Sequence, residues 1–490
     1  MHRHVICIVL ISGITACATT QPEAKPPEAP QRWTCSGEEN ARKQQIEHNM
    51  LPRVVFEGET TPVRIESRMA AHKTPALSVA VINDGKLDWS SAWGVLGVDS
   101  AQAGCDSLFQ AGSLAKPVTL LAALRMKEAG LIDFDRNIDS YLVSYDLPAG
   151  RQTEGNPVTF RNLFAHTAGI TPGGYAGYAQ TEALPTDQQI VRAEPPSNSR
   201  KVEVLNEPGT SLIYSGGGYT VIEIALQDQL RKPFEQIMSE WLIDPVGMKQ
   251  ATYAQPPPPA IRERIARGHR ADGSIVPDGW RNHPEQAAAG LWATANDMAA
   301  FLLEIYKAHN GNSKVLSQAS IRELLAAPIE RHAYGFRLIG EADQVFITHY
   351  GGTEGYRAGM TLNLRTGDGA VYLSNSDAGS DLGAEFLAAV SRVYEWTAFR
   401  EVRVTRVTQP VEVLQSLAGV YTFPRGRDVS VVYEKQLTLV FPNGDRYALE
   451  PIKGAPRRFI HPASAVEVTF EGEGLQTRLH LYGQIGTRRP

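Results

Sequence analysis

Residues 109–120 read FQAGSLAKPVTL and place Ser113 and Lys116 three positions apart, at the start of an apolar run. The run continues to Leu124 before charged residues return. It is apolar on nearly every side, which predicts a helix that is buried all round rather than one lying on a surface. A lysine at the start of such a helix either reaches water or has a chemical task.

The spacing of this pair suits nucleophilic chemistry. On a helix, positions i and i+3 share one face with their Cβ atoms about 5–6 Å apart, so the amine of Lys116 can reach the hydroxyl of Ser113. Burial, the helix dipole and any nearby cation all disfavour the charged amine. A neutral or proton-sharing amine can help to take the serine proton. A chain of this length holds about one S-x-x-K by chance, so a purely structural interpretation stays open.

A second stretch, PGTSLIYSGGGYTVIEIA, places Tyr214 directly before a glycine cluster and an apolar helix. Beside a lysine ammonium the phenolate form becomes accessible, and the phenol can then carry protons between nucleophile and leaving group. The alternative interpretation is a tyrosine packed at a helix start, with glycines that serve a tight turn.

A third stretch, ITHYGGTEGY, carries His349, Tyr350, Gly351 and Gly352 after a predicted strand. Small residues at a strand edge let a substrate backbone lie alongside, and backbone N–H groups there can face a developing oxyanion. The alternative is a lone histidine on a strand that ends in a turn.

Together, the three stretches resemble the penicillin-recognising serine hydrolases, and among them the class C β-lactamases, the D-alanyl-D-alanine carboxypeptidases and related esterases. That family carries S-x-x-K, then Y-x-N or a variant, then K-T-G or H-x-G, in the order seen here. The phrases RNLFAHTAGI, LIDPVGMKQATY and AAAGLWATANDMAAFL also resemble its framework, so the resemblance covers about 60–396.

The resemblance implies an α+β, β-lactamase/transpeptidase-like fold, with an antiparallel sheet flanked by helices plus a helical subdomain. It implies that Ser113 is the nucleophile that forms an acyl-enzyme, and that Lys116 and Tyr214 share the general acid/base work. The backbone N–H groups of Ser113 and Gly352 would form the oxyanion hole. The resemblance implies neither a metal nor an organic cofactor.

Four residues are expected to contact the substrate, namely Gly216, His349, Tyr350 and Gly351. Gly216 stands where the family usually has an asparagine, and His349 stands where efficient class C enzymes have a lysine. His349 would supply positive or hydrogen-bonding character. Both departures argue against strong β-lactam turnover and keep esters and D-amino peptides open. His166 is expected to be structural.

The N-terminus has the features of a targeting segment. Residues 1–17 combine a basic start, an apolar stretch and small residues before Cys17, which predicts a secretory signal. The ending Ile14-Thr15-Ala16-Cys17 resembles the bacterial lipobox, which implies a lipid on Cys17 and an outer-membrane lipoprotein that faces the periplasm. The alternative is an ordinary signal with a soluble product. Residues 18–50 are predicted to be a Pro-rich tether.

The remaining chain divides into two predicted domains, a hydrolase domain over 51–400 and an all-β domain over 405–490 whose short alternating strands predict a small barrel or a sandwich. Residues 411–490 resemble the lipocalin-like barrel domain that is appended to some members of the same family. Strands are predicted at 76–82 and 87–94, joined by a hairpin at Asp84-Gly85. The later elements of the hydrolase domain are expected as helices at 159–165, 219–230, 234–242, 295–308 and 317–326, strands at 333–339, 344–349, 357–364 and 369–374, and a helix at 382–396.

Bulk properties exclude several classes of function. The net charge of the 490 residues is −5, and no long basic run is present, so no nucleic-acid partner is expected. No G-x-S-x-G, H-E-x-x-H or P-loop motif occurs. Cys7 lies in the predicted signal and Cys17 would carry the lipid, so two cysteines remain, Cys35 and Cys105. The sequence leaves open whether they form a disulfide.

The sequence therefore predicts a lipid-anchored serine hydrolase that acts on an ester, an amide or a β-lactam. One alternative is a cell-wall DD-carboxypeptidase or D-amino peptidase. Another is a non-catalytic binding lipoprotein that keeps the hydrolase fold, although the presence of serine, lysine and tyrosine together argues against it.

Overall fold

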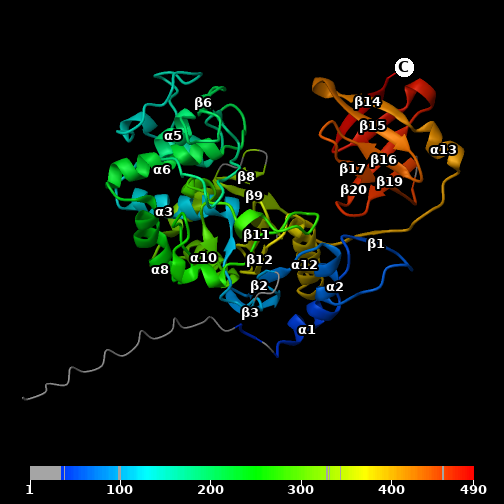
Figure 1. The fold of residues 1–490 in the computed structure, drawn as a ribbon, viewed down its shortest axis with the longest axis horizontal. Helices are drawn as coiled ribbons and strands as arrows, with labels where there is room; N and C mark the ends of the chain where they lie inside the picture. The colour runs from blue at the N-terminus through cyan, green and yellow to red at the C-terminus, as the bar shows by residue number, and fades with distance from the viewer. Residues whose placement is uncertain are drawn as a thin grey trace, which may run out of the picture. The chain divides into compact units, whose positions relative to one another are not determined.

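The computed structural model describes residues 35–37, 39–97, 101–326, 329, 331–342, 344–454 and 457–489 (Figure 1). The predicted signal peptide, its Cys17 and most of the predicted tether lie outside these ranges. No helix within the described ranges is long and apolar enough to cross a bilayer.

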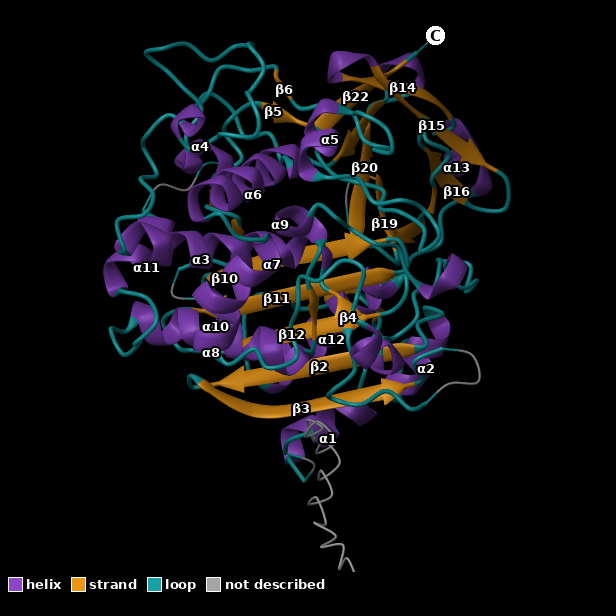
Figure 2. Cartoon of the chain, turned by 60° about the vertical axis from the view of Figure 1, so that its left-hand side comes forward, coloured by secondary structure: helices purple, strands orange, loops and turns teal. Residues whose placement is uncertain are grey.

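The central element is a seven-stranded sheet with the order β3-β2-β12-β11-β10-β9-β8, in which every neighbouring pair is antiparallel (Figure 2). Its strands come from both ends of the hydrolase domain. In chain order they are β2 (Ala76–Asn83), β3 (Lys86–Gly94), β8 (His332–Ala333), β9 (Phe336–Ile339), β10 (Phe346–Thr353), β11 (Tyr356–Asn363) and β12 (Gly369–Ser374). This arrangement confirms the predicted fold class.

Both faces of this sheet are buried, and β2 shows why. Leu77, Val79 and Val81 pack into one apolar cluster, while Ala80 and Ile82 pack into the other. Successive strand residues point to opposite faces, so a run that is apolar at nearly every position needs cover on both sides. Helices α1 (Ala41–His48), α2 (Ile65–Ala71) and α12 (Gly379–Val393) contribute to the first cluster, and α3 (Ala115–Glu128), α6 (Gly216–Leu230) and α10 (Ala295–His309) contribute to the second.

Smaller elements complete the hydrolase domain. They are β1 (Val54–Phe56), β4 (Phe109–Gln110), α4 (Phe160–Phe164), β5 (Ile170–Thr171), α5 (Asp187–Arg192), β6 (Glu203–Val204), α7 (Phe234–Met238), α8 (Asp244–Val246), α9 (Gln286–Ala289), β7 (Trp292–Ala293), α11 (Gln318–Leu325) and β13 (Val402–Val404). Cys35 and Cys105 form a disulfide, which settles the pairing that the sequence left open.

The C-terminal part is a nine-stranded antiparallel sheet that forms a nearly closed barrel, as predicted. Helix α13 (Val411–Ser416) precedes it. Its strands are β14 (Gly419–Phe423), β15 (Arg427–Tyr433), β16 (Leu437–Val440), β17 (Arg446–Ala448), β18 (Glu450–Ile452), β19 (Arg457–His461), β20 (Val466–Glu471), β21 (Arg478–Leu481) and β22 (Gln484–Arg488). Buried side chains such as Tyr421, Phe459 and Phe470 fill its interior.

Local predictions differ from the structure in several places. The helix predicted at 219–230 begins at Gly216, and the strand predicted at 344–349 runs from Phe346 to Thr353. The strand predicted at 333–339 is broken, because Tyr334 and Gly335 adopt positive φ angles of 22° and 71° and turn the chain between β8 and β9. The helix predicted at 382–396 begins earlier, at Gly379, and ends at Val393. In contrast, the hairpin at Asp84 and Gly85 is confirmed, since both residues have the positive φ that a tight two-residue turn requires.

Candidate active site

Ser113 lies in a single 3₁₀ turn, Gly112–Leu114, that leads directly into α3. Gly112 has a φ of +53°, and a Cβ atom there would lie 2.8 Å from the backbone nitrogen of Gly352. A side chain at position 112 would therefore be strained and would also push β10 away. The glycine lets the turn that carries Ser113 approach the strand that carries Gly352.

Lys116 is in the first turn of α3 and is only 2% exposed. Its Nζ donates to Ser113 Oγ at 3.2 Å and to the carbonyl oxygen of Ala288 at 2.7 Å. Ala288 belongs to α9, which a second buried group holds in place, because Glu223 accepts a hydrogen bond from the Ala287 N–H at 2.9 Å. The predicted pairing of Ser113 and Lys116 is present in the structure.

Tyr214 comes from a distant part of the chain, and its ring centroid lies 5.0 Å from Lys116 Nζ. The ring packs on the imidazole of His166, with centroids 4.3 Å apart. The next residue is fixed on both sides, because the Ser215 N–H donates to His166 Nδ1 and Ser215 Oγ accepts from the Gly218 N–H at the start of α6. The structure therefore brings the predicted serine, lysine and tyrosine together.

Strand β10 passes directly beside the turn that carries Ser113. A Cβ atom at Gly351 would lie 2.0 Å from the carbonyl oxygen of Ala111 and 3.2 Å from the backbone nitrogen of Ser113. Only glycine permits this approach, and it brings the backbone nitrogens of Ser113 and Gly352 into one region. Two N–H groups at such a place can stabilise an oxyanion when both are directed at it.

The outer edge of β10 is available to a substrate. Strand β9 pairs with β10 only over Phe346–Thr348. From His349 onward, no strand within the described ranges pairs with that edge. An extended substrate backbone can therefore add to the sheet there, beside the predicted nucleophile.

Two histidines of the site, His349 and His166, are buried in their neutral form. Burial, followed by the positive charge of Lys116, lowers the pKa of His349 to about 3. The same two causes hold the pKa of His166 well below its usual value. Of the two roles considered for His349, positive charge and hydrogen bonding, only hydrogen bonding fits this environment.

A pocket of about 180 Å³ adjoins these residues. His166, Tyr214, Phe336 and His349 line it, together with Arg337, which is exposed. No ion pair or hydrogen bond engages the Arg337 guanidinium within the described ranges. Two buried, neutral histidines thus line this pocket, and the guanidinium of Arg337 lies on its wall.

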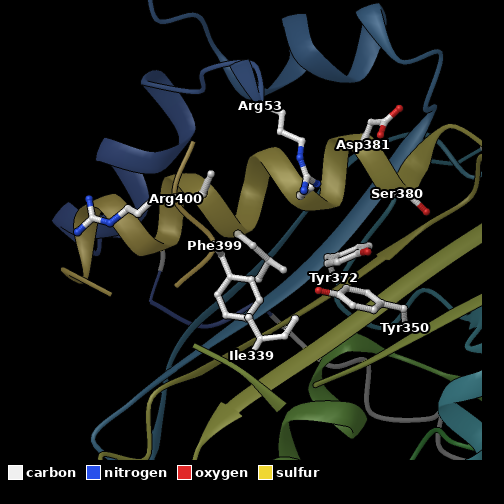
Figure 3. A pocket seen from close by; sticks show the side chains of 11 residues that line it. Arg53, Ile339, Tyr350, Tyr372, Ser380, Asp381, Phe399 and Arg400 are labelled. Atoms are coloured by element: carbon white, nitrogen blue, oxygen red, sulfur yellow. The ribbon is translucent and has the colours of Figure 1, made fainter. Parts of the chain in front are cut away.

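Two predicted contact residues have surroundings that the sequence did not indicate. A Cβ atom at Gly216 would lie 3.1 Å from the ring of Tyr175 and 3.2 Å from the Gly173 carbonyl oxygen, so a neighbouring loop fills the space of a side chain. Tyr350 is 41% exposed and lines both the pocket beside Tyr214 and a second one (Figure 3). Alternation along β10 directs it to the opposite face from His349 and Gly351.

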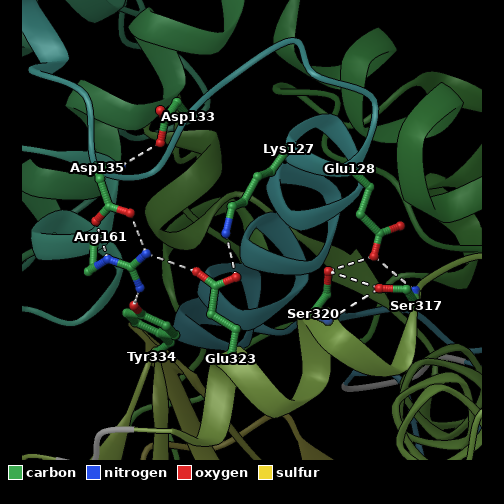
Figure 4. Close-up of polar contacts among 9 residues, drawn as sticks. All are labelled: Lys127, Glu128, Asp133, Asp135, Arg161, Ser317, Ser320, Glu323 and Tyr334. Carbon is green, nitrogen blue, oxygen red and sulfur yellow. Dashed lines mark hydrogen bonds and ion pairs between the residues drawn. The ribbon is translucent and has the colours of Figure 1, made fainter.

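An ion-pair network connects the elements around the site (Figure 4). Arg161 of α4 pairs with Asp135 and Glu323 and donates to the hydroxyl of Tyr334, in the turn between β8 and β9. Lys127, near the end of α3, pairs with the same Glu323 of α11. The network ties the helix that follows Ser113 to the turn that leads into one wall of the pocket.

Sequence reasoning missed two contacts that position the residues of the site. His166 was expected to be structural, and it is indeed a packing partner, but the residue it packs on is Tyr214. The Ala288 carbonyl, which holds Lys116, has no side-chain signature at all. The only sequence signal for the packing of His166 on Tyr214 was the phrase AHTAG around His166.

The chain is similar in sequence to a known protein family and to several of its members. The sequence model of the Beta-lactamase family matches residues 64–392. The chain is 22% identical over 277 residues to "Beta-lactamase-like protein 4" of Dictyostelium discoideum, covering 53% of this chain and 47% of that protein. It is 21% identical over 404 residues to "Penicillin-binding protein 4*" of Bacillus subtilis (strain 168), covering 77% of this chain and 86% of that protein. The chain thus spans about half the length of the first relative and most of the second.

Among solved structures, the fold is similar to that of the octameric penicillin-binding protein homologue from Pyrococcus abyssi. The TM-score is 0.58 at 19% sequence identity, covering 86% of this chain and 98% of that one. At this identity the likeness shows a shared fold.

Proposed function

We propose that this chain, which belongs to the Beta-lactamase family, is a serine hydrolase that works through an acyl-enzyme on Ser113. One observation carries the proposal. A lysine that is 2% exposed has its Nζ 3.2 Å from the hydroxyl of Ser113 and 5.0 Å from the ring of Tyr214. Acyl transfer through a serine requires a nucleophile and a neighbouring group that takes and returns its proton, and an amine beside a phenol can do this.

In the proposed reaction, Ser113 Oγ attacks the substrate carbonyl carbon and its proton passes to the Lys116–Tyr214 pair. The tetrahedral intermediate collapses as the C–O or C–N bond breaks, and the leaving group takes a proton from the same pair. Water then attacks the acyl-serine and gives a proton to the pair. The carboxylic acid product leaves as Ser113 recovers its proton.

The oxyanion of each tetrahedral intermediate would be held by the backbone N–H groups of Ser113 and Gly352. The close approach of β10 to the serine turn supports this role. Fixed backbone donors cost no reorganisation during the reaction, and one such donor is worth about 10²–10³ in kcat.

For the substrate, we propose an ester or an amide with an uncharged acyl group. The pocket beside Tyr214 is small, and His166 and His349 in its lining are neutral. Gly216 offers no side-chain amide to a peptide or β-lactam, and Tyr175 occupies the adjoining space. These features favour ester hydrolysis over strong β-lactam turnover.

Arg337 favours a second candidate, a DD-carboxypeptidase or D-amino peptidase. Its guanidinium is exposed on the pocket wall and could pair with the terminal carboxylate of a peptide. Under this hypothesis Arg337→Gln lowers peptide hydrolysis at least about tenfold and leaves ester hydrolysis unchanged. Arg136→Gln, at an exposed arginine on another part of the domain, is the matched control.

The deciding experiment is a substrate panel on wild type and Ser113→Ala. The panel contains p-nitrophenyl butyrate, nitrocefin and a D-alanyl-D-alanine peptide. The proposal predicts that wild type hydrolyses the ester and that Ser113→Ala loses at least about 10³-fold of kcat/KM. Equal activity in the two proteins would remove Ser113 from the mechanism, and a folded wild type that acts on no substrate would favour the binding-lipoprotein hypothesis.

We also propose that Cys17 carries a lipid and anchors the protein to the outer membrane on its periplasmic side. The support is the Ile14-Thr15-Ala16-Cys17 ending of an apolar signal. Metabolic labelling with a fatty-acid probe should mark the wild-type protein and leave Cys17→Ser unmarked. Equal labelling of both proteins would contradict a lipid at this cysteine.

A further inference from the structure

A second pocket, of about 470 Å³, lies on the face of the sheet opposite Ser113, between α12 and strands β10 and β12 (Figure 3). Its position follows from strand alternation. Tyr350 lines this pocket, whereas its neighbours His349 and Gly351 face the serine turn. The volume is within the range of small-molecule sites, which is about 300–1,000 Å³. This second pocket shares Tyr350, and no other lining residue, with the pocket beside Tyr214.

Three polar groups in this pocket lack partners. Within the described ranges, no hydrogen bond or ion pair engages the guanidinium of Arg53, and no hydrogen bond engages the hydroxyls of Tyr350 and Tyr372. Arg53 reaches over α12 toward the two tyrosines (Figure 3). Its positive charge acts on both phenols, opposing the rise in pKa that burial causes in each.

The position of Tyr372 is built into the surrounding backbone. A Cβ atom at Gly359 of β11 would lie 2.3 Å from its ring, and one at Gly383 of α12 would lie 2.2 Å from it. Glycine on both sides therefore gives the ring a tight slot between strand and helix, and Tyr372 is only 2% exposed. A donor held this firmly costs little entropy when it binds a ligand.

The rest of the lining tells which ligand fits. Ile339, Leu387 and Phe399 supply an apolar wall. One acidic residue, Asp381, is also in the lining and interacts with the charge of Arg53. It offsets part of that positive charge and repels anions, so it disfavours a ligand with two or more negative charges most strongly. A guanidinium and two phenol hydroxyls are donors that suit a single carboxylate.

We propose that this pocket binds a small organic monocarboxylate with an apolar body. The carboxylate meets Arg53, Tyr350 and Tyr372, and the apolar body packs on Ile339, Leu387 and Phe399. The site stands independently of the proposed hydrolysis, because Arg53 and Tyr372 do not line the pocket beside Tyr214.

The test uses isothermal titration calorimetry on full-length Ser113→Ala protein, so that no acyl-enzyme can form. The probes are 4-phenylbutyrate and its uncharged amide, 4-phenylbutanamide. We expect one molecule of the acid to bind per chain and the amide to bind at least about tenfold more weakly, since the charge-assisted bonds are lost.

Two variants locate the site. Arg53→Gln should raise the Kd of the acid at least about tenfold, and Tyr372→Phe, which keeps the packing, should raise it about threefold. Arg136→Gln, with an exposed arginine elsewhere, should leave the Kd unchanged. Thermal melts of each variant show whether the fold is kept. If Arg53→Gln does not fold, Tyr372→Phe alone tests the location of the site.

Three results would overturn the proposal. One is equal affinity for acid and amide, which would remove the role of the carboxylate. Another is an unchanged Kd in a folded Arg53→Gln or Tyr372→Phe protein, which would place the ligand elsewhere. The third is an affinity for the acid weaker than about 10 mM.

Discussion

Replacing Gly351 by alanine tests the contact between β10 and the serine turn. The new Cβ atom would lie 2.0 Å from the Ala111 carbonyl oxygen, although such contacts are not seen below 3.0 Å, so one of the two backbones must move by about 1 Å. A misplacement of about 1 Å can cost about 10²-fold in rate. We expect kcat for p-nitrophenyl butyrate to fall about 100-fold, with a smaller change in KM.

The assay needs a control for the general effect of adding a methyl group. Gly155→Ala provides it, because a Cβ atom there would meet nothing within 4 Å. This variant should keep wild-type kcat, and melting curves should show both variants folded at the assay temperature. A Gly351→Ala protein with wild-type kcat would refute the reasoning, since it would mean that β10 does not need to approach the serine turn.

Three further predictions concern the surroundings of the site. His166→Ala removes the ring that packs on Tyr214 and the acceptor of the Ser215 N–H, and steady-state kinetics should show kcat about tenfold lower. His349 is buried in its neutral form, so the unfolded chain binds more protons between about pH 6.5 and 3, and stability should fall as pH drops through this window by about 1.4 kcal/mol per unit. Urea unfolding should show a flatter profile for His349→Gln, and an unchanged profile would contradict the buried neutral state. Cys35→Ser opens a disulfide across 70 residues and should lower the free energy of unfolding by about 2–4 kcal/mol, while equal urea midpoints would contradict it.

The parts of the site that could be predicted from sequence have either a local spacing or a motif in the order that a known family shows. Ser113 and Lys116 are one helical turn apart, so their contact follows from helix geometry alone. Tyr214 is about a hundred positions further along the chain, and only the resemblance to a known family joined it to them. The hairpin at Asp84 and Gly85 was predictable because two residues with positive φ leave a clear sequence signature.

The remaining features depend on tertiary contacts that leave no such signature. The Ala288 carbonyl holds Lys116 through a backbone atom, which any residue could supply. The neutral state of His349 comes from burial beside Lys116, which spacing cannot reveal. The break near Tyr334 was missed because residues 333–339, AYGFRLI, resemble one continuous strand with a single glycine in it.

The most direct measurement of the central claim is the rate at which a fluorophosphonate labels Ser113, followed by mass spectrometry of the modified peptide. Lys116→Met keeps the length and burial of the side chain without the amine. If the buried amine activates the hydroxyl, wild type will carry the label on Ser113, and the folded Lys116→Met protein will react at least about 100-fold more slowly. A label on another serine, or equal rates for the two proteins, would contradict the account.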